Sequence, residues 1–261
     1  MEGIAGIVAQ EQVRRGEIFY EEGRRLLTSE VNTLVTALVA HGIADIIVKD
    51  AHGTGLNLLV EHLHPGARYV LGPSRTEQRF PGLDSSFSAA FLIGYHAMAG
   101  TEAAIMDHTM VPFDWQCVEL DGQAVGEITL DALIFGVFGV PVTLVSGDDK
   151  TCAEARNVLG EVATYETKQA IARNAALALA PAQVQQLIES AVGAALTKIG
   201  SANPCRLSPR SGANPHELRL TFASSRMADG RYYDGESSIR VDGTTALYRD
   251  ADLLRLLARA L

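Results

Sequence analysis

Features that would place a protein in a class at once are scarce in this sequence of 261 residues. It has only three cysteines, Cys117, Cys152 and Cys205, and they form no CxxC or Cys/His spacing. This argues against a disulfide scaffold and against a thiolate zinc site, and it favours a reducing compartment. No run approaches the ~18 consecutive apolar residues of a membrane span, and the N-terminus lacks a basic segment followed by an apolar one. We therefore expect a cytoplasmic protein.

Basic charge is also in short supply. The sequence has 22 Lys and Arg against 31 Asp and Glu, which gives a formal net charge of −9. Because the acidic residues are spread over the whole length, this balance argues against nucleic-acid or anionic-membrane binding and favours a small ligand or a protein partner. With 47% hydrophobic and 20% charged residues, the chain is neither disordered nor collagen-like. Its length indicates one large domain or two.

Helix-like and strand-like patterns alternate in the first part of the chain. Apolar residues recur with helical spacing over about 17–40, and Gly42 follows where such a helix would end. Short apolar runs predict buried strands at 43–48, 89–94 and 141–146, each of which ends at polar residues. We therefore predict an α/β fold with a mostly parallel sheet and flanking helices, and ligands at the carboxyl ends of its strands.

The remainder predicts a smaller α+β part. A hairpin is expected at 115–125, because Asp121-Gly122 supplies a left-handed turn, and a helix should follow to about Phe135. The Ala/Leu-rich stretch 165–199 predicts helices, with Pro181 in the first turn of the second. A loop, three strands and a final helix are predicted at 200–216, 217–222, 239–241, 244–248 and from 250. We divide the chain into a catalytic domain, 1–164, and a smaller domain, 165–261.

Three histidines are the main candidates for chemistry. His52, His96 and His108 each follow an apolar run and lie in a polar turn close to glycine. Carboxylates in similar settings are Glu2, Asp50, Asp107 and Glu127. Imidazole and carboxylate are the usual ligands of catalytic zinc. The alternative is that the histidines are half-buried at strand ends and that Glu127 only begins a helix. Spacing alone leaves both open, because the sequence has no HExxH signature. GxGxxG, P-loop and GxSxG patterns are missing too.

Five short segments of the chain carry a further signal when they are taken together. These five are Met1-Glu2-Gly3-Ile4-Ala5-Gly6, Lys49-Asp50-Ala51-His52, Phe91-Leu92-Ile93-Gly94-Tyr95-His96-Ala97, Ile105-Met106-Asp107-His108-Thr109-Met110 and Val125-Gly126-Glu127. In this order they resemble the DppA-type zinc-dependent D-aminopeptidase family, and the ordered set is far more specific than any one segment. Two later segments, at 145–149 and 168–173, look similar as well, so that the resemblance covers nearly the whole chain.

The resemblance implies a two-domain metallopeptidase that releases N-terminal D-amino acids from short peptides and assembles into a homo-oligomer, a decamer. It also implies two zinc ions per chain. Glu2 and His52 would bind one ion, His96 and Glu127 would bind the other, and His108 would be a catalytic residue beside them.

One feature of the family pattern is missing from the sequence. The family opens with a strand that ends in Asp-x-Glu-Gly, and this Asp bridges the two ions. The sequence begins at Met1, after the position of that Asp, so the bridging Asp is not present in this chain. Loss of a buried strand would cost more than the ~5–15 kcal/mol by which a domain is stable. We therefore expect the natural chain to begin further upstream.

If the Asp ligand is genuinely absent from the natural chain, two rival functions remain, and they differ in the number of metal ions. A mononuclear metal amidohydrolase would use His96, Glu127 and one more ligand. A non-catalytic oligomeric binding or assembly protein would hold none. The joint presence of the candidate histidines and Glu127 argues against the second rival. Selectivity for D-residues rests on the resemblance alone.

Overall fold

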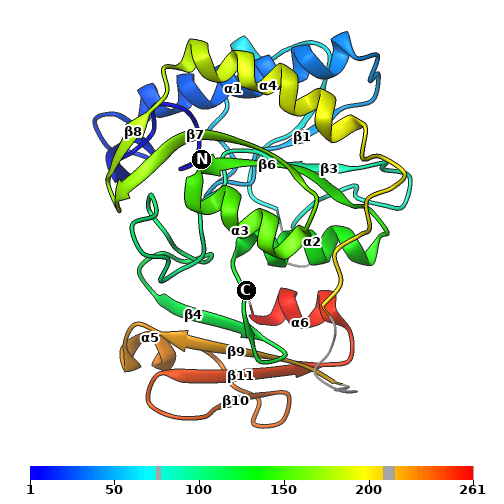
Figure 1. Ribbon diagram of the computed structural model, residues 1–261. Coiled ribbons are helices and arrows are strands. Elements are labelled where there is room, and N and C mark those ends of the chain that lie inside the picture. The colour runs from blue at the N-terminus through cyan, green and yellow to red at the C-terminus, as the bar shows by residue number, and fades with distance from the viewer. Residues whose placement is uncertain (75–77, 208–214, 261) are drawn as a thin grey trace.

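The computed structural model describes residues 1–74, 78–207 and 215–260, and its upper part in Figure 1 is built on parallel strands. β3 (Ala90–Leu92), β6 (Val142–Asp148), β7 (Ala163–Ala172) and β8 (Ala175–Ala178) form a four-stranded sheet in that order. β3, β6 and β7 are parallel, and β8 returns antiparallel to β7. β1 (Ile47–Lys49) and β2 (Arg68–Val70) form a separate parallel pair. The α/β fold with parallel strands is confirmed.

Four helices cover the two faces of this parallel layer. α1 (Tyr20–Ala40) and α4 (Pro181–Leu196) pack together on one face, whereas α2 (Glu127–Val137) and α3 (Asp149–Leu159) lie on the other (Figure 1). Short 3-10 helices occur at Gln10–Gln12 and Val60–His62.

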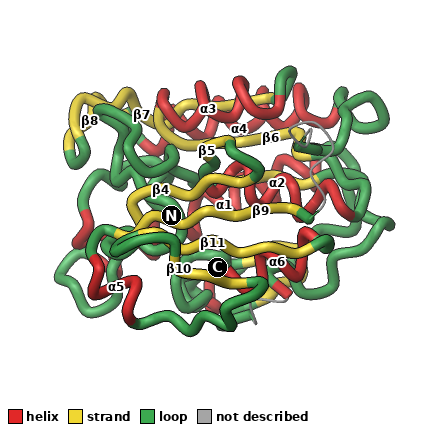
Figure 2. Tube along the Cα trace, turned by 90° about the horizontal axis from the view of Figure 1, so that it is seen from below, coloured by secondary structure: helices red, strands yellow, loops and turns green. Residues whose placement is uncertain are grey.

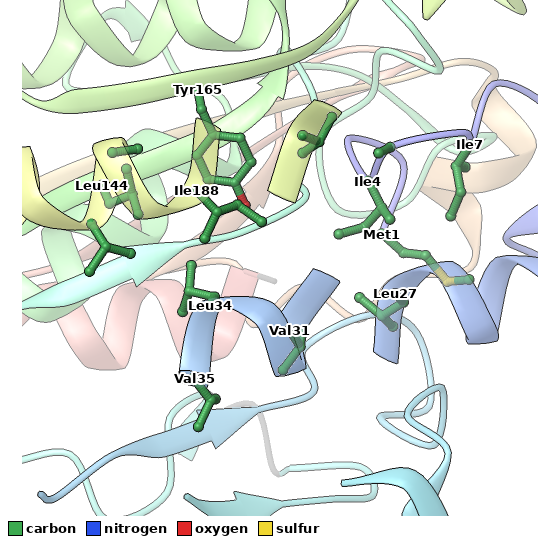
Figure 3. Close-up of a cluster of buried hydrophobic side chains, with 14 of the residues drawn as sticks. Met1, Ile4, Ile7, Leu27, Val31, Leu34, Val35, Leu144, Tyr165 and Ile188 are labelled. Atoms are coloured by element: carbon green, nitrogen blue, oxygen red, sulfur yellow. The ribbon is translucent and has the colours of Figure 1, made fainter. Parts of the chain in front are cut away.

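The first residues of the chain are part of the main core. Met1, Ile4 and Ile7 are buried and lie close to Leu27 of α1, in the cluster that also contains Ile188 of α4 (Figure 3). Burial of such apolar side chains stabilises the fold by about 1.5–3 kcal/mol each. The N-terminal loop that carries Glu2 is therefore held by packing against the main core.

The lower part of the molecule is a five-stranded antiparallel sheet. Its order is β10 (Ser238–Arg240), β11 (Thr245–Asp250), β9 (His216–Phe222), β4 (Trp115–Leu120) and β5 (Gln123–Ala124), which Figure 2 shows from below. α6 (Leu253–Ala260) packs on β9 and β11, and the short α5 (Ser225–Asp229) lies beside β9. Both sheets take strands from both sides of residue 164, and the division into 1–164 and 165–261 stays a prediction.

Helix α2 belongs to both cores. Ile128 and Ala132 pack in the cluster against the parallel sheet, whereas Leu130 and Leu133 pack in the cluster of the five-stranded sheet. A helix that is apolar on all sides is a buried helix. The carboxylates that α2 carries must therefore find partners inside the protein.

Most of the predicted elements are confirmed. The first helix, the strands at β1, β3 and β6 and the three strands and helix at the C-terminal end lie where the patterns predicted them, within a few residues. The hairpin turns at Asp121 and Gly122, with φ of 51° and 78°. Of the predicted loop 200–216, residues 208–214 lie outside the described residues. No helix in the described ranges is long and apolar enough to cross a membrane.

The prediction of helix from residue 165 is wrong up to residue 180. Residues 163–172 and 175–178 form the hairpin of β7 and β8, and only α4 from Pro181 is helical. Alanine and leucine favour helix in isolation. Pairing of β7 with the buried strand β6 overrides that preference, because it satisfies the backbone of both strands in the interior.

Candidate metal centre

The five predicted site residues come together in two groups. In the first, His52, which follows β1, lies with Nε2 3.0 Å from Oε1 of Glu2. In the second, Oε1 of Glu127 lies 3.3 Å from Nε2 of His96, which follows β3, and 3.6 Å from Nε2 of His108. The charge of Glu2 also acts on His96 and on His108, so the two groups are neighbours. The strand ends thus meet at one site, as the topology predicts.

All three histidines direct the same nitrogen into the site. Nδ1 of His96 lies 3.1 Å from the carbonyl oxygen of Ala97, and Nδ1 of His108 lies 2.8 Å from that of Met106. A carbonyl oxygen only accepts hydrogen bonds, so Nδ1 of each ring carries a proton, and Nε2 is the nitrogen left to bind a metal ion once it is deprotonated. Nδ1 of His52 similarly faces Oδ1 of Asn57, at 3.4 Å. Metal-binding histidines are held in this way, with the second nitrogen on an oxygen.

The loop that carries His108 has an unusual backbone. Ala103, Met106 and Met110 have positive φ angles of 52°, 47° and 63°, although none is glycine. Such conformations cost about 1–3 kcal/mol each and are found mostly at functional sites. They let Met106 accept from His108 and let the Met110 N–H donate to Oε1 of Glu127 at 2.7 Å. The rings of His96 and His108 stack at 3.7 Å with 15° between their planes.

The buried charges of the second group change one another's protonation. Burial alone would lower the pKa of His96, but the Glu127 carboxylate raises it to about 9. Burial and the neighbouring His96 lower the pKa of His108. Burial alone would raise the pKa of Glu127, but His96 outweighs it and holds that pKa far below its usual value. The second group therefore holds an ionised carboxylate beside one charged and one neutral imidazole.

Glu2 is held by its own charge partners and by a buried lysine. Burial alone would raise its pKa, but the N-terminal ammonium and His52 keep that pKa well below its usual value. Lys168 of β7 is 2% exposed, and its ammonium donates to the carbonyl oxygens of Glu2, Ile4 and Ile7 at 2.8, 2.8 and 2.5 Å. Three backbone carbonyl groups of the N-terminal loop are thus bound by one ammonium group.

Two glycines allow the Glu2 loop to approach β3. A Cβ atom on Gly3 would lie 2.0 Å from the carbonyl oxygen of Tyr95, and one on Gly94, whose φ is +69°, would lie 2.6 Å from the side chain of Ile4. The Gly3 N–H donates to the Gly94 carbonyl at 3.1 Å. Only glycine leaves room for this contact.

Two of the candidate carboxylates lie outside both groups. Asp50 accepts from the backbone N–H groups of Asn57 and Leu58 at 2.6 and 3.1 Å, so it orders the loop that holds His52. Asp107 pairs with Arg173 at the surface. Both carboxylates have structural partners.

Sequence reasoning missed the residues that support the site. Tyr95 and Lys168 lie in segments that carry the family resemblance but received no role, and Arg79 and Asp131 lie outside those segments. All four lie beside the candidate ligands or their partners. One available signal was α2, an apolar segment with acidic residues at positions 127 and 131 on one face. The distant partners of these acids carry no sequence signal.

The donors present fit zinc. Carboxylate oxygens and neutral imidazole nitrogens are the ligands that Zn²⁺ takes in catalytic sites. The ligand atoms of His96, His108 and Glu127 all lie within 4.8 Å of one another, and Glu2 and His52 form a second pair beside them. All five side chains are buried or nearly so, with His52 the most exposed at 24%. Burial would strengthen the hold of such a set on a cation.

Comparisons with known proteins agree with this fold and with the family that the sequence segments resemble. A family model described as D-aminopeptidase, peptidase family M55, matches residues 1–260. The D-aminopeptidase of Bacillus subtilis (strain 168) is 32% identical over 254 residues, which cover 97% of this chain and 90% of that protein. The solved structure of the Zn-dependent D-aminopeptidase DppA from Bacillus subtilis, described as a self-compartmentalizing protease, superposes with a TM-score of 0.89 and 32% identity, covering 98% of this chain and 91% of DppA. The chain therefore belongs to the M55 peptidase family of D-aminopeptidases, as its sequence motifs predict.

Proposed function

We propose that the protein is a zinc-dependent aminopeptidase that removes N-terminal D-amino acids from short peptides, with two zinc ions per chain. The observation that carries the proposal is the pair of neighbouring His/carboxylate groups whose Nε2 atoms all face the site. Glu2 and His52 would hold one ion, and His96 and Glu127 would hold the other. Zinc bound here would supply a Lewis acid for the scissile carbonyl and a water of lowered pKa.

His108 is the candidate for proton transfer. Its Nδ1 is occupied by the Met106 carbonyl, so its Nε2, which faces Glu127, is the atom that can take up or release a proton. Burial lowers the pKa of His108, which keeps the ring neutral and able to accept. A proton accepted at Nε2 can pass to the leaving amine as the peptide bond breaks.

The proposed substrate and oligomeric state are inferred from the relatives of this chain. The relatives of this chain are D-aminopeptidases, and the solved one is a self-compartmentalizing protease. We therefore expect short peptides with an N-terminal D-residue as substrates and a homo-oligomer, a decamer, that encloses the sites.

Paired peptides test the activity directly. The purified protein is assayed with D-Ala-D-Ala and L-Ala-L-Ala at equal concentration, before and after zinc removal with a chelator. Hydrolysis of the D-peptide that stops with the chelator and returns with zinc is expected. Equal hydrolysis of both peptides would contradict the stereoselectivity, and activity that survives complete zinc removal would contradict the zinc dependence.

One observation favours a second candidate, a mononuclear metal amidohydrolase. The ligand atoms of His96, His108 and Glu127 lie close enough together to hold one ion by themselves. In that case His108 is a ligand, and Glu2 and His52 hold none. The zinc content of His108→Ala separates the two candidates, because only the mononuclear enzyme would lose its metal.

A further inference from the structure

The two oxygens of Glu127 face different partners. Oε1 faces Nε2 of His96 and of His108 and accepts from the Met110 N–H. Oε2 faces Nη2 of Arg79, at 3.5 Å. The carboxylate therefore lies between the candidate zinc position and a guanidinium group, and each side takes one oxygen.

Arg79 is itself held by a buried carboxylate on the same helix. Its guanidinium pairs with Asp131 through Nε to Oδ1 and through Nη2 to Oδ2 at 2.9 Å. Asp131 is completely buried, and it also accepts from the hydroxyl of Tyr95 at 2.6 Å. Glu127 and Asp131 are four residues apart and lie on one face of α2, so one guanidinium spans both.

We infer that Arg79 is a positioning residue that holds Glu127 so that one carboxylate oxygen, Oε1, is presented to zinc. The inference rests on the proposed function, in which Glu127 is a zinc ligand. The Tyr95 hydroxyl supports the Asp131 carboxylate, that carboxylate holds the guanidinium, and the guanidinium holds Oε2 of Glu127. Arginine suits this task because its rigid fork of N–H donors can bind two carboxylates at once, which the single ammonium of lysine cannot do in the same plane.

Charge balance agrees with this role. Arg79 is 20% exposed in its side chain, and Asp131 neutralises it from the buried side. The pair brings no net charge to the site, so its effect on a bound cation acts through the geometry of Glu127 rather than by repulsion. Without Arg79, Oε2 of a buried carboxylate loses its partner. The carboxylate could then turn and present either oxygen or both.

The test measures zinc affinity by competition with a chelator. In Arg79→Gln the apparent dissociation constant of the ion held by His96 and Glu127 should rise about 10–100-fold, the range known for partners that orient metal ligands. Arg79→Lys should lie close to Arg79→Gln, and Tyr95→Phe, which removes one support of Asp131, should show a smaller rise. Arg68→Gln is the matched control. Arg68 pairs with Asp45 at the surface, at 2.7 Å. The Arg68→Gln variant should therefore bind zinc as tightly as the wild type does.

A double-mutant cycle separates positioning from general damage to the fold. If Arg79 acts through Glu127, then Arg79→Gln should weaken zinc binding in the wild type but add little in a Glu127→Gln background. Equal effects in both backgrounds would overturn the inference. Thermal melting of the zinc-free proteins shows whether each variant folds. If Arg79→Gln does not fold, the same double-mutant cycle with Glu127→Gln is measured for Tyr95→Phe and for Arg79→Lys.

Failure of the inference is distinguishable from failure of the proposed function. A wild-type protein that binds no zinc would overturn the proposed function. A wild type that binds zinc, together with an Arg79→Gln variant whose zinc affinity is unchanged, would overturn the role of Arg79 alone.

Discussion

At the scale of single residues, His96 and His108 show how the same side chain can be given two roles. Both rings donate from Nδ1 to a backbone carbonyl, and both direct Nε2 towards Oε1 of Glu127. They differ in the direction of their pKa shifts, which is upward for His96 and downward for His108. The ring nearer to the carboxylate suits binding, and the neutral one suits proton transfer.

Alanine substitution should separate these roles. His96→Ala is expected to lose one of the two zinc ions, because it removes a ligand. His108→Ala should keep both ions but lose about 100-fold or more in kcat, which is the usual contribution of a general acid or base. Zinc content and kcat are measured on the same samples. A fully active His108→Ala would show that the residue has no catalytic role.

Lys168 is the clearest stability determinant among the single residues. Lys168→Met keeps the apolar stem but removes the ammonium donor of three buried carbonyl oxygens, of which that of Ile4 still accepts from the Ile7 N–H at 3.1 Å. The free energy of unfolding should fall by about 3 kcal/mol or more. Urea denaturation measures this, with Lys150→Met as the control, because Lys150 is exposed on α3 and should change nothing measurable. A stable Lys168→Met would contradict the role of the ammonium in holding the Glu2 loop.

The same lysine should make stability depend on pH. Burial lowers the pKa of Lys168 to about 8, whereas an unfolded lysine titrates at ~10.4. Between these values the unfolded chain binds more protons, so the free energy of unfolding rises with pH. The stability difference between wild type and Lys168→Met should therefore widen from about pH 8 to ~10.4. If the difference in free energy of unfolding narrowed over this range instead, the lowered pKa of Lys168 would be contradicted.

At the scale of elements, the sequence predicts what depends on local pattern and misses what depends on distant partners. Helix α1, strands β1, β3 and β6 and the turn at Asp121-Gly122 follow from apolar periodicity and turn chemistry. Hairpin β7–β8 does not, because its alanines and leucines favour helix and only pairing with β6 makes it a strand. The candidate ligands could be predicted as motifs in order. Arg79 and Lys168 could not, since their partners lie far away in the sequence.

The contact between the N-terminal loop and β3 can be tested at one glycine. Gly3→Ala should push the loop away from Tyr95, because the added Cβ would lie 2.0 Å from a backbone oxygen that cannot move easily. We expect a loss of about 1–3 kcal/mol and the loss of the zinc ion next to Glu2. Gly230→Ala is the control, because a Cβ there meets its nearest atom at 3.5 Å. Unchanged zinc content in Gly3→Ala would contradict the placement of Glu2.

At the scale of the whole molecule, the site lies beside the helix that joins the two cores. Glu127 begins α2, and α2 packs on both the parallel and the antiparallel sheet. Movement of one core against the other would therefore change the position of Glu127.

The edge of the parallel sheet is the surface that we expect to contribute to assembly. Among the described strands, β8 pairs only with β7, and the hairpin exposes Ile171 and Leu177, at 65% and 67%. Exposed apolar edge strands tend to pair with other chains unless they are protected. Leu177→Lys should therefore reduce the molar mass in solution, measured by light scattering. Val241→Lys, at an exposed position after β10, is the control and should leave it unchanged. If the Leu177→Lys variant kept the molar mass of the wild type in solution, this edge would not be part of the assembly interface.

We propose above that Glu2, His52, His96 and Glu127 form a zinc centre. Elemental analysis of the purified, folded protein tests it most directly, as zinc ions per chain. We expect two zinc ions per chain. One ion per chain would contradict the two-ion arrangement, and none would contradict the metal centre altogether.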